Sequence, residues 1–106
     1  MTKEQFYQGL SEVVETFYGK APMGQALPYA VFTWDHDNNF PADDIVYQSV
    51  ATITVNLYAV DPAIESAVDA KLTEMGLFWT STTSFEFDDD AYLTIYTMEE
   101  FEDEES

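Results

Sequence analysis

The run Ile45–Val60 constrains the fold more than any other part of the chain. It contains no glycine, proline or charged residue, and its β-branched and aromatic side chains favour a strand over a helix. From Thr52 to Ala59, polar and apolar residues alternate, which is the pattern of a half-buried strand. Fully extended, the run would span about 50 Å at about 3.3 Å per residue, whereas a domain of this length is about 30–35 Å across. We therefore expect a strand that bends, bulges or projects from its domain.

The first helix is predicted over Thr2–Tyr18. Thr2 and Gln5 have the spacing of a capping box, and Gly19 is suited to the position just past the helix end. Its predicted apolar stripe consists of Phe6, Leu10, Val13, Val14 and Phe17.

The second helix is predicted from Pro62 to about Met75. Asp61 is a good N-cap residue, proline is tolerated in the first turn, and Gly76 favours termination. The buried stripe of this helix is Ile64, Ala67, Val68, Leu72 and Met75.

The remaining sequence predicts an α+β fold with the element order α-β-β-α-β-β. Strands are expected at Tyr29–Asp35, Ile45–Val60, Leu77–Phe87 and Ala91–Met98. Because helices and hairpins are segregated, we expect two helices packed on one face of an antiparallel sheet of about four strands, with a long projecting strand. Residues 1–98 would form one domain, and Glu99–Ser106 would be an acidic, solvated or disordered tail.

The charge of the chain excludes several functions. Twenty-one acidic residues face three lysines, and arginine is absent. Binding to nucleic acid or to an anionic membrane rests on basic residues, so we expect neither, and no apolar run is long enough to span a membrane. The N-terminus begins with mixed polar sequence, and we expect a soluble protein made in a cytoplasm. Solubility alone could account for the charge; a basic partner, an acidic surface along which DNA slips, or a DNA mimic are the alternatives.

No pattern in the sequence predicts an enzyme, a metal site or a cofactor. Four residues match ligand positions 1, 3, 5 and 9 of a calcium-binding loop: Asp35, Asp37, Asn39 and Asp43. The pattern then fails, because Phe40 replaces the glycine of the sharp turn and Val46 replaces the bidentate glutamate. The single histidine, His36, stands in the same polar loop with no specific nucleophile to pair with. Aromatic residues make up 16% of the chain, which favours a protein interface.

Several segments resemble the small tail-terminator or tail-completion proteins of long-tailed bacteriophages and prophages. The resemblance is carried by Leu27-Pro28-Tyr29-Ala30-Val31-Phe32, then Phe40-Pro41-Ala42-Asp43-Asp44 with Tyr47, and then Val55-Asn56-Leu57-Tyr58. The helix that begins Ala63-Ile64-Glu65, its stop at Gly76, the pair Phe78-Trp79 and the strand with Tyr92 and Tyr96 extend it over nearly the whole chain. The tail Glu99–Ser106 is outside the resemblance.

The resemblance implies a structural role in the virion. Such proteins form a ring, typically hexameric, that caps the tail tube at its head-proximal end and joins it to the head-completion or connector protein. DNA only passes through the bore, where like charge would let it slide. By this analogy, the expected interface comprises Phe40, Asp43, Asp44, Tyr47, Val50 and Thr52.

Two other functions are compatible with the sequence. An acidic inhibitor or DNA mimic could occupy the nucleic-acid site of a basic partner, although the acids cluster in loops and the tail instead of along a strand surface. A small α+β adaptor with one protein partner is the third hypothesis.

Overall fold

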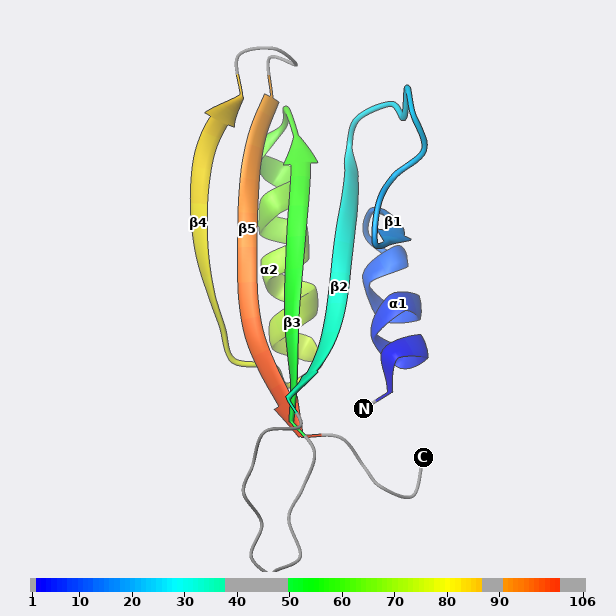
Figure 1. Cartoon of the computed structure of the whole chain (residues 1–106). Coiled ribbons are helices and arrows are strands. Elements are labelled where there is room, and N and C mark those ends of the chain that lie inside the picture. Colours follow the sequence, from blue (N-terminus) through cyan, green and yellow to red (C-terminus); the bar gives the residue numbers. More distant parts are fainter. Residues whose placement is uncertain (1, 38–49, 87–90, 102–106) are drawn as a thin grey trace, which may run out of the picture.

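The protein folds as a five-stranded mixed sheet with two helices, as the computed structural model shows for residues 2–37, 50–86 and 91–101 (Figure 1). The elements are α1 (Lys3–Ser11), β1 (Glu15–Tyr18), β2 (Tyr29–Asp37), β3 (Val50–Ala59), α2 (Pro62–Glu74), β4 (Trp79–Glu86) and β5 (Ala91–Phe101). The strand order across the sheet is β1-β2-β3-β5-β4. The predicted α+β class is confirmed. The predicted antiparallel sheet of about four strands is corrected to a mixed sheet of five, because β1 is parallel to β2.

The predicted first helix is too long. The capping box is present, with Thr2 Oγ1 accepting from the Gln5 N–H at 3.1 Å and Gln5 Oε1 accepting from the Thr2 N–H at 2.8 Å. The helix nevertheless ends at Ser11, and after a turn the chain enters β1 at Glu15. The sequence from residue 13 to 17 is rich in β-branched and aromatic side chains, which lose rotamer freedom in a helix and suit a strand.

Helix α2 agrees closely with its prediction. Asp61 caps its N-terminus, accepting from the Ala63 N–H at 2.9 Å. At the other end Gly76 has a φ of 81°, and the Leu77 N–H donates to the Leu72 carbonyl at 3.1 Å. This left-handed cap leaves Leu77 folded back onto Leu72, and both side chains are buried.

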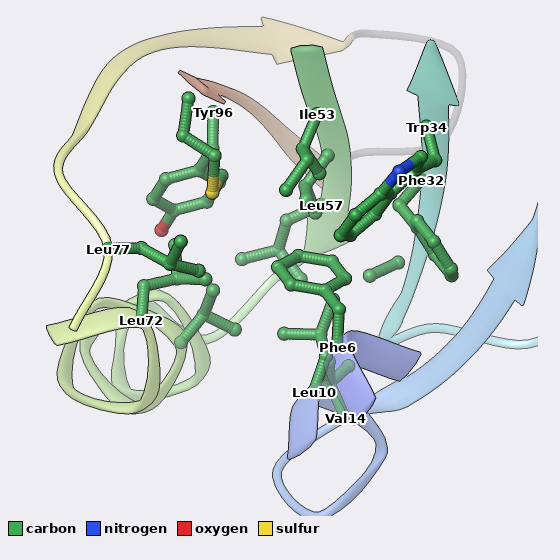
Figure 2. Close-up of a cluster of buried hydrophobic side chains, with 14 of the residues drawn as sticks. Phe6, Leu10, Val14, Phe32, Trp34, Ile53, Leu57, Leu72, Leu77 and Tyr96 are labelled. Carbon is green, nitrogen blue, oxygen red and sulfur yellow. The ribbon is translucent and has the colours of Figure 1, made fainter. Parts of the chain in front are cut away.

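The hydrophobic core lies between the helices and one face of the sheet. Figure 2 shows Phe6 and Leu10 of α1 beside Phe32 and Trp34 of β2, with the side chains of β3, β5 and α2 completing the cluster. The ring centroid of Phe6 lies 5.2 Å from that of Phe32 and 6.0 Å from that of Trp34. Both helices therefore cover the same face, as predicted.

The long strand is central instead of projecting, as far as the structure describes it. β3 pairs antiparallel with β5 over its whole length and with β2 on the other side from Val50 to Tyr58. Ile53, Val55, Leu57 and Ala59 are buried on the helix side, as the alternation predicts. Residues 45–49 lie outside the described residues.

Strand β5 extends beyond the predicted end at Met98. It continues through Phe101, and Glu99 and Phe101 pair with Thr52 and Val50 of β3. The start of the segment expected to be a tail therefore belongs to the sheet. Neither α1 nor α2 is long and apolar enough to span a membrane.

Candidate interaction surface

The sheet has a second face on which neither α1 nor α2 packs, here called the open face. It presents the side chains that alternate with the core residues along each strand. In rows across the sheet, it consists of Asp35, Thr52 and Glu99; then Thr33, Thr54, Thr97 and Thr80; then Phe17, Val31, Asn56, Ile95 and Thr82; and finally Glu15, Tyr29, Tyr58, Leu93 and Ser84.

A continuous row of four threonines crosses the middle of the open face. Thr33 is opposite Thr54, Thr54 is opposite Thr97, and Thr97 is opposite Thr80, one residue on each of four adjacent strands. Adjacent strands lie about 4.8 Å apart, so the row extends roughly 14 Å. It forms a strip of methyl and hydroxyl groups without charge.

In these rows, charge on the open face lies at the two ends. Asp35 and Glu99 flank Thr52 in one end row, Glu15 of β1 lies beside Tyr29 in the other, and the two rows between them carry no ionisable side chain. At the opposite end, Tyr29 and Tyr58 stack with ring centroids 5.0 Å apart. The centre combines threonine, asparagine, tyrosine and aliphatic side chains, a mixture low in charge as in the core of protein interfaces.

A groove adjoins the aromatic end of the open face. Its walls are the connector after β1 and the strands β2 and β3, and its volume is about 550 Å³. Its lining residues with polar side chains are Lys20, Gln25, Tyr29, Asn56 and Tyr58. Gln25 is held in place, because its Nε2 donates to Glu15 Oε1 at 2.7 Å. The side chain of Met23, at the rim, is fully exposed.

A polar cluster lies beneath the sheet on the helix side. The Tyr96 hydroxyl donates to Asp69 Oδ1 of α2 at 2.6 Å, and Thr94 Oγ1 donates to Glu65 Oε1 at 3.5 Å. Burial, followed by the hydrogen bond to Asp69, raises the pKa of Tyr96 far above its ordinary value near 10. A tyrosine held neutral in this way fastens α2 to β5 and is unsuited to act as a base. Within the described ranges, no group of three acidic or histidine residues could hold a metal ion.

The predicted interface residues fall into two groups. Val50 and Thr52 lie at the start of β3, where the backbone of each is paired with both β2 and β5. The hydrogen-bonding edges of residues 50–52 are therefore used within the sheet, while the expected interface itself stays a prediction. The side chain of Thr52 lies on the open face and is still available to a partner. Phe40, Asp43, Asp44 and Tyr47 lie outside the described residues.

The alternation of polar and apolar residues indicates the open face, but the predicted interface was not based on it. Thr52, Thr54, Asn56 and Tyr58 form the polar half of the alternating pattern in β3, and Thr80 and Thr82 repeat it in β4. Only the strand register shows that these residues meet in rows. The aromatic residues, by contrast, are partly core, since Trp34 and Tyr96 are buried.

No model of a known protein family matches the chain, and no curated protein shows a significant match to it.

Proposed function

We propose that this protein is a structural component of a long-tailed bacteriophage or prophage that terminates the tail tube and forms the head–tail joining surface. In this role it assembles as a ring, hexameric by analogy, between the tail tube protein and a head-completion or connector protein. It acts in the virion after assembly in the host cytoplasm, and it is not an enzyme.

The open face is the observation that carries the proposal. A five-stranded sheet covered by helices on one side and presenting uncharged threonine, asparagine, tyrosine and aliphatic rows on the other is suited to packing against protein. Ile95, at its centre, is 36% exposed, and such surface gains stability when a partner removes it from water. An assembly protein needs a surface of this kind and no catalytic group.

The negative charge of the protein favours a role in which DNA passes by without being bound. A net charge of −18 repels phosphates. Two of the three lysines are engaged within the protein, since Lys71 Nζ contacts Glu12 Oε1 at 2.8 Å and Lys3 Nζ lies 4.4 Å from the centroid of the Tyr18 ring. A ring of such subunits would present an acidic bore along which DNA slides.

An acidic inhibitor or DNA mimic fits the open face less well. A mimic needs carboxylates spaced along an exposed surface as phosphates are. In the rows described above, the carboxylates of the open face lie at its ends, Asp35 and Glu99 in one end row and Glu15 in the other. The neutral rows between the two ends favour a protein–protein contact.

The proposal is tested by adding the purified protein to the polymerising tail tube protein of the same phage. We expect tubes of shorter mean length, each with this protein at one end in electron micrographs. Asn56→Lys, which places a charge in the centre of the open face, should abolish capping. Ala70→Lys adds the same charge at an exposed site on α2 and should cap normally. Tubes that elongate equally with and without the protein would contradict the proposal.

A further inference from the structure

Strand β4 forms one edge of the sheet. It pairs with β5 from Trp79 to Glu86, and within the described residues no strand pairs with its outer side. Alternate N–H and C=O groups of an edge strand point outward and are a template for another strand. The other edge is formed by β1, which has four residues, begins at Glu15 and packs against α1, and beyond it by residues 33–37 of β2, which include Asp35 and Asp37.

The β4 edge lacks the features that normally prevent strand pairing. Its register with β5 is unbroken, so no bulge twists it away. From Trp79 to Ser84 it contains no charge, proline or glycine, and the five hydroxyl-bearing residues 80–84 are all exposed. Native proteins commonly blunt such edges with lysine, proline or a short strand. An unblunted edge of this kind is open to pairing with a further strand.

The net charge of the chain restricts where a second copy could approach it. Two copies, each with a net charge of −18, repel one another over most of their surfaces. They can approach closely only where the surface is neutral, and β4 is the edge that is neutral along its middle. A basic partner would be drawn to the acidic surfaces instead. Because each chain offers one long edge of this kind, self-pairing through it must be two-fold and antiparallel.

We propose that two copies of this chain associate through β4, antiparallel about a two-fold axis, so that their sheets join into one continuous sheet. Opposed residues in an antiparallel pair share a face. An axis through Thr82 therefore sets Thr80 opposite Ser84 and Ser81 opposite Thr83 of the second copy. Pairs of hydroxyl-bearing residues stabilise antiparallel strands.

The exposed side chain of Phe78 fits this arrangement. Phe78 precedes β4 and is 92% exposed, the most exposed aromatic residue among those the structure describes. Next to the two-fold contact, its ring would lie near the end of the second copy's β4 and lose contact with water. The pairing does not depend on a role in phage tails, and its failure would leave that proposal standing.

The test compares the mass of the full chain in solution with that of two charge variants. Sedimentation equilibrium over micromolar to millimolar concentrations should give a species of twice the 12.1 kDa chain mass. Thr82→Lys and Thr82→Glu each place like charges opposite one another, so each should weaken the dimer by about two- to fivefold. An equimolar mixture of the two variants should restore it. Ala70→Lys, at an exposed site on α2 and away from both the β4 edge and the open face, should dimerise as the unaltered protein does.

Hydrogen exchange gives a second measurement that needs no variant. Amides of residues 79–86 should exchange more slowly as the protein concentration rises, while those of β1 should not change. A monomer throughout the concentration range would overturn the proposal. So would a dimer unaffected by Thr82→Lys, a mixture no stronger than the single variants, or a ring-sized species in place of the dimer.

Discussion

The Tyr96 hydroxyl of β5 donates a 2.6 Å hydrogen bond to Asp69 Oδ1 of α2, across the boundary between sheet and helix. The tyrosine side chain is buried and its ring lies edge-on to Trp79, with centroids 5.2 Å apart. One side chain thus fills the core and satisfies a polar group of α2. We expect this contact to determine how firmly α2 is held.

Removing the Tyr96 hydroxyl should destabilise the protein. Tyr96→Phe keeps the ring but loses a hydrogen bond to a carboxylate, so the free energy of unfolding should fall by about 1–3 kcal/mol. Urea unfolding followed by circular dichroism measures the change. Tyr7→Phe, at an exposed site on α1, is the control and should change stability by less than about 0.5 kcal/mol. Equal stability of the two variants would show that the bond contributes nothing.

Stability should also decline at alkaline pH. The pKa of Tyr96 is raised in the folded protein, so the unfolded chain loses this proton first as the pH rises. The stabilisation is complete below the ordinary pKa near 10 and is lost progressively above it. Lys71, whose pKa is raised by its hydrogen bond to Glu12, adds a loss of the same sign. In urea unfolding from pH 9 upward, Tyr96→Phe should show a shallower decline than the unaltered protein; an identical decline would contradict this assignment.

The two faces of β3 should respond oppositely to the same added charge. Val55 is fully buried on the helix side, so Val55→Asp places a carboxylate in the core without a partner and should prevent folding. Asn56→Asp, on the open face, should leave the protein folded. Far-ultraviolet circular dichroism of both variants measures the difference. A folded Val55→Asp protein would mean that β3 is not the central strand.

Salt should stabilise the protein. With 21 acidic residues and three lysines, repulsion between carboxylates outweighs the attraction in contacts such as Lys71–Glu12. Screening that repulsion by added sodium chloride should raise the unfolding temperature by a few degrees. Differential scanning calorimetry at low and high salt provides the measurement. Potassium chloride in place of sodium chloride is the control and should give the same shift. A lower unfolding temperature in salt would indicate that ion pairs dominate.

The sequence predicted the elements whose local signals agree with one another. For α2, the N-cap Asp61, the apolar stripe and Gly76 all indicate the same bounds. For β3, the alternation from Ile53 to Ala59 names the buried face correctly. In such segments, the secondary-structure propensity, the hydrophobic pattern and the capping residues all indicate the same element, and the observed element agrees with them.

The errors arose where one local pattern fits two structures. Phe6, Leu10 and Val14 are spaced as a helical stripe, and all three are buried. The spacing cannot show that the chain leaves the helix at Ser11 and that Thr16 becomes a buried strand residue beside Ala30. Likewise, the acids at residues 99 and 100 indicated a solvated tail, but pairing with Thr52 and Ala51 of β3 holds this backbone in the sheet. Both outcomes depend on tertiary pairing, which local composition does not encode.

The open face was only half predictable. Its residues can be read from the alternation in β3 and β4, but its rows depend on the strand order β3-β5-β4. Thr97 lies between Thr54 and Thr80 in the row, and it belongs to β5, which follows both of their strands in the sequence. The register of distant segments, and not any motif, creates the surface.

The central claim, the proposed role in ending a phage tail and joining it to the head, is tested most directly by deleting the gene from the genome that encodes it and inducing phage production. Tail lengths and head attachment are then measured in electron micrographs of the lysate. The account predicts tails of abnormal, variable length without attached heads, restored by the unaltered gene and not by Asn56→Lys. Tails of normal length joined to filled heads in the absence of the gene would contradict it.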